Sequence, residues 1–195
     1  TEVLSIKKEK HYFQVKANQS TFTSRIVINA AGLYADKIAN MVGLNDFTIT
    51  PRKGQYLLFD KSEGNLVHQV IFQTPTQAGK GILVSPTYEG NLLIGPNAEI
   101  AETPDDRETS VESIDNIVKG ARKTMPNFDL RKVITTFSGN RATPSTGDFI
   151  IEESTVLDFI NVAGIESPGL TASPAIALHV VYIIRDKGVE LKLNF

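Results

Sequence analysis

The sequence predicts an α+β protein in which an antiparallel sheet, covered by a helix, accompanies part of an α/β domain. Three observations predict this class. Short β-type runs joined by Gly, Pro and Asn signals fill the middle of the chain, residues 51–137. A pattern of strand, small-residue turn and helix lies on each side of them, at residues 25–43 and 158–185. Strands with one covering helix indicate an α+β layer, whereas strand–helix alternation is typical of α/β layers.

The composition excludes several classes of function. The chain has 195 residues, of which 41% are hydrophobic and 22% charged, and its net charge is −2. That charge does not favour a nucleic-acid partner. The absence of cysteine excludes disulfides, thiolate nucleophiles and Cys-ligated metals, and the three histidines show no metal-ligand spacing. With no secretory signal and no apolar run of bilayer length, we expect a cytoplasmic location and no metal.

The first fifty residues predict a hairpin, a buried strand and a helix. Two β-type runs flank the polar stretch 7–11, and a third short run contains Phe22. Residues 26–28 form an unbroken apolar row, which is typical of a strand buried on both faces. Residues 33–42 have helical spacing, and Gly43 is a plausible stop. We assign residues 1–50 to the remainder of an α/β domain.

Residues 51–137 predict a second domain built on an antiparallel sheet. The strand-like segments are 54–60, 68–75, 81–95 with a hairpin turn at 88–91, and 132–139. One helix interrupts them. Thr109 and Glu112 have capping-box spacing, and an apolar stripe runs from Val111 to Met125. The acidic stretch from Glu99 to Glu112 is interpreted as a solvated face that starts the helix favourably.

Residues 138–195 predict a return to the first domain. Residues 149–154 and 158–164 read as a hairpin, and a helix is expected from about Pro174 to Arg185. The segments "VINAAGLYAD" and "INVAGIESPGLTASPAIA" share one design, in which a buried strand leads through a tight turn into a helix. A helix start leaves N–H groups unpaired, and glycine allows close approach, so both predict a ligand near the strand ends. Ordinary βα turns are the alternative for each.

Five segments in series resemble one known family. They are "VINAAGLYADKIANMVG", "PRKGQYLLFDK", "GKGILVSPTYEGNLLIGPNA", "SGNRATPSTGDFIIE" and "FINVAGIESPGLTASPAIA". In this order they resemble the FAD-dependent oxidoreductases of the D-amino-acid-oxidase superfamily, glycerol-3-phosphate dehydrogenase type, with L-2-hydroxyglutarate oxidase as a near relative. The GxGxxG unit of that family is missing, so we expect a fragment without the N-terminal half of the flavin domain. Gln55 stands where relatives commonly have Glu, which puts a carboxylate role there in doubt.

The resemblance implies FAD as the cofactor and hydride transfer from the C–OH of a small anionic substrate, first of all glycerol 3-phosphate. It implies that both bends contact FAD, through Ala30, Ala31, Gly32, Tyr34 and Ala35 at the first, and Gly164, Ile165, Ser167, Pro168, Gly169, Leu170 and Thr171 at the second. It places Arg141 where a guanidinium can hold a carboxylate or phosphate. The alternative is a surface ion pair of Arg141 with Asp148.

Two further substrate contacts are predicted, and each has an ordinary structural role as its alternative. Lys80 could present a second cation, or be an ordinary turn lysine. Tyr56 could face the substrate from the sheet, or be a strand tyrosine with a satisfied hydroxyl. His68 could accept a proton only if it points into a cleft, and no catalytic base is identified.

Other functions stay open from the sequence. An L-2-hydroxyglutarate-like or other 2-hydroxy-acid oxidase and an amino-acid oxidase also act on anions, so Arg141 does not separate them. A non-catalytic antiparallel-sheet binding module is the alternative of another class. The resemblance leaves open an electron-transfer partner protein and peripheral membrane association of the parent protein. We expect the isolated fragment to be inactive and to bind FAD weakly or not at all, because half of the cradle is absent.

Overall fold

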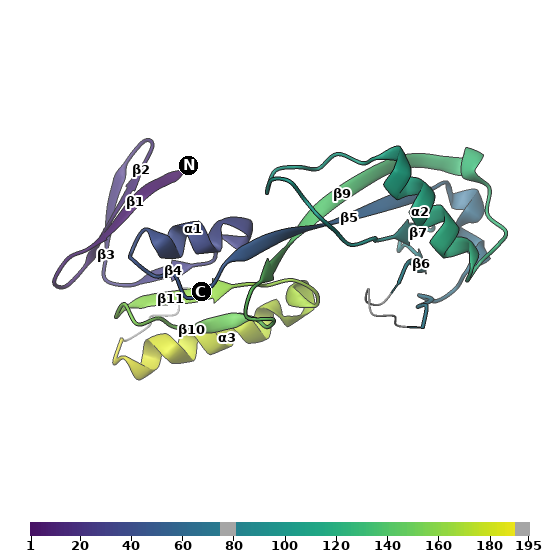
Figure 1. Cartoon of the computed structure of the whole chain (residues 1–195). Helices are drawn as coiled ribbons and strands as arrows, with labels where there is room; N and C mark the ends of the chain where they lie inside the picture. Colours follow the sequence, from purple (N-terminus) through teal and green to yellow (C-terminus); the bar gives the residue numbers. More distant parts are fainter. Residues whose placement is uncertain (75–80, 190–195) are drawn as a thin grey trace. The chain divides into compact units, whose positions relative to one another are not determined.

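The computed structural model describes residues 1–74 and 81–189, and they form two compact units (Figure 1). The first unit combines Thr1–Thr50 with Arg141–Phe195, and the second is Pro51–Asn140. The sequence predicted divisions after residues 50 and 137. The functions assigned to these domains remain predictions. The predicted contact Lys80 lies outside the described residues.

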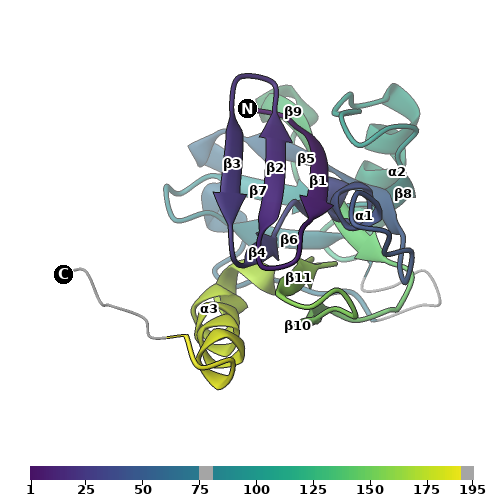
Figure 2. The ribbon, with the colours of Figure 1, turned by 90° about the vertical axis from the view of Figure 1, so that its left-hand side faces the viewer.

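The first unit contains two small sheets. One is an antiparallel meander of β1 (Val3–Lys8), β2 (Phe13–Ala17) and β3 (Thr21–Ser24), which Figure 2 shows face on. The other has the order β10–β11–β4. In it, β10 (Ile150–Glu153) runs antiparallel to β11 (Phe159–Ala163), and β4 (Val27–Asn29) runs parallel to β11. The strands and the hairpin predicted at both ends of the chain are therefore present.

Strand β4 is shorter and more exposed than the sequence predicts. Ile26 packs in one hydrophobic cluster and Val27 against another, but the side chain of Ile28 is 46% exposed. Among the residues that the structure describes, β4 pairs only with β11. The prediction of a strand buried on both faces is therefore wrong for Ile28, because an edge strand has cover only where a neighbouring layer reaches it.

Two helices follow the two parallel strands. A 3₁₀ turn, Gly32–Tyr34, leads into α1 (Ala35–Asn40), and Gly43 ends this segment with a φ of +86°. Helix α3 (Gly169–Asp186) follows β11 and packs Val180 and Ile184 against the strand residue Ile160. Only residues 164–168 separate the two elements, so the start of α3 lies next to the end of β11.

Helix α3 begins five residues earlier than predicted, and Pro174 lies inside it. A proline at this position lacks the N–H that would bond to the carbonyl of Leu170. The hydroxyl of Ser173 donates to that carbonyl oxygen instead, at 2.8 Å. The helix tolerates Pro174 because a neighbouring side chain satisfies the acceptor that the proline leaves.

The second unit is a five-stranded sheet covered on one face by α2 (Val111–Arg122). The sheet order is β6–β7–β5–β8, and β9 also pairs with β5. The strands are β5 (Ile49–Phe59), β6 (Leu83–Pro86), β7 (Leu92–Gly95), β8 (Glu99–Ile100) and β9 (Val133–Pro144). Ile117, Val118 and Ala121 of α2 are buried against Leu57 and Phe59 of β5.

Two details of the second unit differ from the predictions. The N-cap of α2 is Ser110, whose hydroxyl accepts the N–H of Ser113, so Thr109 is not the cap and Val111 is 89% exposed. Residues 68–74 form no named strand. They contribute only an isolated bridge from Ile71 to Val84, with backbone bonds of 2.8 and 3.2 Å.

Candidate functional site

The two predicted bends lie side by side at the ends of adjacent parallel strands. Strand β4 ends in Ile28-Asn29-Ala30-Ala31-Gly32, and β11 ends in Ile160-Asn161-Val162-Ala163-Gly164. The two segments share the pattern I-N-x-A-G, and they pair in register, with Ile28 beside Ile160 and Asn29 beside Asn161. Since the carboxyl ends of parallel strands meet at one edge of a sheet, both bends open at the same edge.

The two asparagines tie the bends together. The amide of Asn29 donates to Oδ1 of Asn161 at 2.9 Å and to the carbonyl of Ala35 at 2.8 Å. Both side chains are buried. Oδ1 of Asn29 is buried without a hydrogen-bond partner among the described residues. The first bend is thus fixed to the second strand, and one buried acceptor remains at the junction.

Glycine provides the backbone turn at the same place in each bend. Gly32 has a φ of +56° and Gly164 a φ of +66°, in the left-handed region that favours glycine. A Cβ on Gly32 would meet no atom within 4 Å, whereas a Cβ on Gly164 would lie 2.6 Å from Cγ of Pro144. The first bend is therefore open above its backbone, and the second is packed against the end of β9.

Both bends line one apolar hollow of about 390 Å³. Its walls come from β4, β11 and the first half of α3: Ile28, Ala30, Val162, Ile165, Gly169, Ser173, Ile176, Ala177 and Val180. Segments far apart in the sequence therefore meet around a single volume. Such a hollow can take a flat or chain-like apolar group.

The turn between β11 and α3 is held tightly. Gly169 donates its N–H to the carbonyl of Glu166 at 2.6 Å, and Ala172 donates to that of Pro168 at 3.0 Å. The carboxylate of Glu166 accepts the hydroxyl of Thr143 at 2.7 Å, which fixes the turn to β9. The N-terminal end of α3, with its partial positive charge, is thereby held in place.

The predicted cofactor residues differ in how accessible they are. Ala30, Gly32, Tyr34, Ser167, Pro168, Leu170 and Thr171 are exposed, and Ala31 and Ile165 are partly buried. Ala35, Gly164 and Gly169 are buried. Ala35 packs in the core of the first unit, so its side chain is not available to a ligand. The predicted contacts at both bends remain predictions, and at Ala35 any contact would fall to the backbone.

The predicted substrate residues lie in β9 and β5. Arg141 is half-buried, and its side chain has no hydrogen bond or ion pair with any described residue. The alternative pairing with Asp148 is absent, and Asp148 is exposed. Arg141 is not among the residues that line the apolar hollow. Tyr56 is half-buried and stacks on Phe137 with ring centroids 5.1 Å apart. His68 is exposed.

Gln55 organises a polar network that the sequence analysis missed. Its side chain donates to the carboxylate of Glu99 at 3.0 Å and accepts the N–H of Ser110 at 3.0 Å. Asn97 and Ser113 also donate to Glu99, at 2.6 and 2.8 Å. The interpretation of Glu99 as part of a solvated face is wrong, because its carboxylate binds the start of α2 to the sheet. A glutamate at position 55 would place two carboxylates together.

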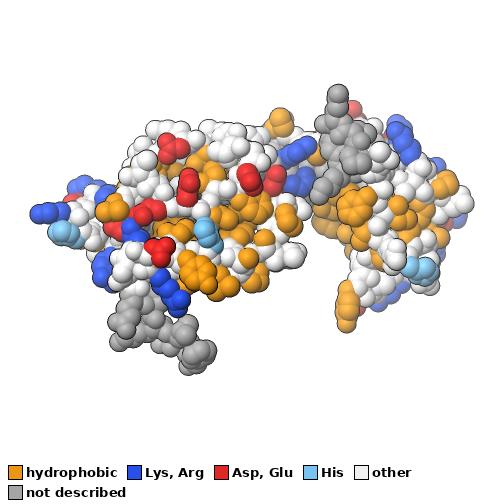
Figure 3. Space-filling model, turned by 90° about the horizontal axis from the view of Figure 1, so that it is seen from below, with side chains coloured by type: hydrophobic (Ala, Val, Ile, Leu, Met, Phe, Trp, Pro, Cys, Tyr) orange, Lys and Arg blue, Asp and Glu red, His pale blue; other side chains and the backbone are white. Residues whose placement is uncertain are grey.

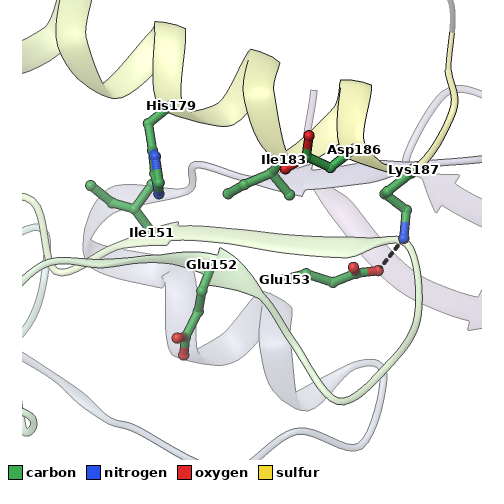
Figure 4. Close-up of a pocket in the computed structure, with 7 residues that line it drawn as sticks. All are labelled: Ile151, Glu152, Glu153, His179, Ile183, Asp186 and Lys187. Carbon is green, nitrogen blue, oxygen red and sulfur yellow. Dashed lines mark hydrogen bonds and ion pairs between the residues drawn. The ribbon is translucent and has the colours of Figure 1, made fainter.

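A second hollow, of about 400 Å³, lies between α3 and β10 (Figure 4). His179 points from α3 towards β10, and Lys187 pairs with Glu153 at its other end. Beside it, hydrophobic side chains gather over α3 (Figure 3). Among the described residues no cluster of three His, Cys, Asp or Glu side chains could hold a metal ion.

The charges at the end of this hollow form a structural cluster. Lys187 binds Glu153 and, at 3.0 Å, Asp158, which also binds Lys8 at 3.2 Å. Burial raises the pKa of the Glu153 and Asp158 carboxyls, but hydrogen bonds and the nearby lysines outweigh it, so both pKa values lie below their usual range. The bond to Glu153 raises the pKa of Lys187. The cluster joins β1, β10 and the end of α3.

The sequence carries a signal for the paired asparagines in its repeated pentapeptide. The repeated I-N-x-A-G pattern could have predicted that Asn29 and Asn161 lie side by side. The Glu99 network left no such signal, because its members are brought together from β5, β8 and the α2 cap. Within the described part of the chain, no helix is both long and apolar enough to cross a membrane.

Comparison with known proteins places these features in a family. The model of the DAO family, FAD dependent oxidoreductase, matches residues 1–183. Glycerol 3-phosphate dehydrogenase of Caloramator mitchellensis is 49% identical over all of this chain and 41% of its own length. Glycerol 3-phosphate oxidase of Mycoplasma genitalium is 39% identical over 91% of this chain and 47% of its own. The chain thus spans less than half the length of these two curated relatives.

A solved structure agrees with the sequence comparisons. The dithionite-reduced L-α-glycerophosphate oxidase of Mycoplasma pneumoniae, with FAD bound, superimposes with a TM-score of 0.84 at 33% identity. The match covers 94% of this chain and 50% of that one. The predicted resemblance and fold class are confirmed.

Proposed function

Because this chain belongs to the DAO family of FAD-dependent oxidoreductases, we propose that it is part of an enzyme that oxidises the C–OH of glycerol 3-phosphate. The observation that carries the proposal is the pair of in-register bends that line one hollow. The names of the relatives at 49% and 39% identity support the choice of substrate.

We infer that FAD lies against the two bends, and the residues present fit this group. The open backbone at Gly32 allows close approach, the orphan Oδ1 of Asn29 offers an acceptor, and the hollow is apolar. Ser167–Thr171 and the start of α3 would stabilise negative charge near a flavin ring. FAD, when bound, supplies the acceptor for the hydride.

Arg141 is proposed to hold the substrate anion. A half-buried guanidinium without a partner among the described residues is suited to a carboxylate or phosphate, which it can bind with two parallel hydrogen bonds. Tyr56 and Lys80 remain predicted substrate contacts. Removing a charged partner of this kind costs about 2–5 kcal/mol. Arg141→Ala in the full-length protein is therefore expected to raise KM for glycerol 3-phosphate strongly, and Arg131→Ala, an exposed arginine paired with Asp129, is the matched control.

Anaerobic titration of the full-length protein tests the function. A yellow protein that glycerol 3-phosphate bleaches supports the proposal. Bleaching only by a 2-hydroxy acid or an amino acid selects that alternative substrate class, and a colourless protein that ignores FAD selects the non-catalytic binding module. The 195-residue chain alone is expected to bind FAD weakly or not at all, so tight stoichiometric binding would contradict that expectation.

Three further predictions concern the parent protein. They are an electron-transfer partner protein, peripheral association with a membrane, and a cytoplasmic location.

A further inference from the structure

Glu166 places a carboxylate in the turn between β11 and α3. Its neighbour Ile165 and the first residue of α3, Gly169, line the apolar hollow against which FAD is proposed to lie. The Glu166 side chain is partly buried, and its Oε2 atom accepts the hydroxyl of Thr143 at 2.7 Å. The Oε1 atom has no hydrogen bond or ion pair with any described residue. One carboxylate oxygen is therefore fixed, and the other is available as a hydrogen-bond acceptor.

The other carboxylates that are buried or partly buried in the first unit are used by the fold. Asp36 is buried, and its carboxylate accepts two backbone N–H groups. Glu9, Glu153 and Asp158 each bind a lysine. Among the described residues of this unit, Glu166 is therefore the partly buried carboxylate to which no cation and no backbone N–H group is bound.

The hydrogen bond to Thr143 places this carboxylate on the same face of β9 as Arg141. Arg141 and Thr143 are two residues apart in the strand, so their side chains leave the same face about 6.5 Å from one another. Arg141 and Glu166 belong to the same compact unit, and neither is ion-paired with any described residue. A small ligand on this face can therefore place an anionic group against the guanidinium and a hydroxyl group against the carboxylate.

We propose that Glu166 is the proton acceptor of the oxidation, and that its Oε1 atom takes the proton of the substrate hydroxyl. The inference rests on the proposed function, in which Arg141 holds the phosphate of glycerol 3-phosphate. The C–O bond becomes a carbonyl, the hydrogen on that carbon leaves with two electrons as a hydride to FAD, and the hydroxyl proton goes to the carboxylate. Thr143 is a positioning residue, because its hydroxyl fixes the other carboxylate oxygen.

A purely structural link between the turn and β9 is the alternative role for Glu166, and two substitutions separate the two roles. Glu166→Gln keeps an oxygen that can accept the Thr143 hydroxyl, but an amide does not serve as a base at neutral pH. Thr143→Val removes the link and keeps the carboxylate. Proton transfer predicts a large loss of rate in the first variant and a small one in the second, whereas a structural link predicts the reverse.

Anaerobic stopped-flow reduction of the full-length holoenzyme by glycerol 3-phosphate measures this step. Glu166→Gln is expected to slow the bleaching of the flavin about 10²–10⁴-fold, the usual contribution of a general base, without weakening substrate binding. Thr143→Val should slow it less than about 10-fold, as for one lost hydrogen bond. Glu152→Gln removes an exposed carboxylate of the same unit and should leave the rate unchanged. Formate, a small carboxylate, should restore part of the rate in Glu166→Ala.

The outcomes distinguish this inference from the proposed function. Bleaching of Glu166→Gln at the rate of the parent would overturn the proton transfer and leave the proposed function standing. Loss of bound FAD from Glu166→Gln would favour the structural link and also count against the proton transfer. A parent protein that glycerol 3-phosphate does not bleach would refute the proposed function and the proton transfer together.

Binding of inorganic phosphate to the oxidised holoenzyme, measured by calorimetry at low ionic strength, gives a readout without turnover. A carboxylate on the same face repels a phosphate held by Arg141, so Glu166→Gln should bind phosphate roughly 3- to 10-fold more tightly than the parent. Glu152→Gln should bind it as the parent does. Equal affinities of Glu166→Gln and the parent, or no phosphate binding by either, would overturn the placement of Glu166 beside the anion.

Discussion

The repeated I-N-x-A-G bend offers a matched pair of substitutions whose costs can be worked from the structure. Gly32→Ala introduces a side chain at a φ of +56° with no atom within 4 Å, so it should cost only the left-handed backbone penalty, about 1–2 kcal/mol. Gly164→Ala has a similar φ of +66°, but its Cβ would lie 2.6, 2.7 and 3.2 Å from Cγ, Cβ and Cδ of Pro144. Overpacking of this kind adds about 1–3 kcal/mol.

The free energy of unfolding in urea, measured on the full-length protein, gives the comparison. We expect Gly164→Ala to lose about 1–3 kcal/mol more than Gly32→Ala, because only the second bend is packed against β9. Pro144→Gly removes all three clashing atoms. In a double-mutant cycle it should therefore cancel that extra loss and leave the backbone penalty. Equal costs for the two alanine variants would refute the reasoning that the bends share a backbone shape and differ in packing.

Three further predictions concern stability. Gly120→Ala places a better helix former in α2, yet its Cβ would lie 2.7 Å from Cγ1 of Ile82, so we expect a net loss in the unfolding free energy instead of the gain of about 1 kcal/mol that propensity predicts; a gain would contradict the packing argument. Ser110→Ala should lower the unfolding free energy by about 1 kcal/mol because it removes the α2 cap, whereas Ser110→Asn, which keeps a capping oxygen, should lose less, and equal losses would argue against the cap. Lys187→Met should cost about 1–3 kcal/mol at pH 7. The pKa values of Glu153 and Asp158 are lowered in the folded state, so their contribution is present above the unfolded values of about 4 and is lost as the pH falls through the folded ones. The cost of Lys187→Met should therefore disappear on acidification, and a pH-independent cost would count against the charge cluster.

Sequence patterns predicted the elements that depend on local signals. The hairpins, the strand–turn–helix units and the place of both bends follow from periodicity and from glycine. The sequence also predicted that the two bends serve one ligand, and their meeting at the lining of one hollow supports that prediction. What brings them together is the parallel pairing of β4 with β11, to which the repeated pentapeptide is the clearest pointer.

The features that the sequence did not predict depend on residues far apart in the chain. Ser110 replaces Thr109 as the cap because Thr109 is engaged with Thr136 of β9, at 3.0 Å. Glu99 is interior to a polar network whose donors come from three elements. The early start of α3 depends on the hydroxyl of Ser173, which compensates for Pro174. In each case a contact in the folded structure decides an outcome that the local sequence preference alone does not give.

The alternation of β5 should be visible in a saturation-mutagenesis map as stripes two residues apart. Substitutions at Lys53, Gln55 and Leu57 should reduce the amount of protein in the cell, because these side chains anchor α2 and the loop before it. Substitutions at Tyr56, the predicted substrate contact that leaves the opposite face of the strand, should leave abundance intact and reduce turnover. Neighbouring positions of one strand would then affect either stability or the reaction. A screen that measures only protein abundance would miss the positions that affect the reaction.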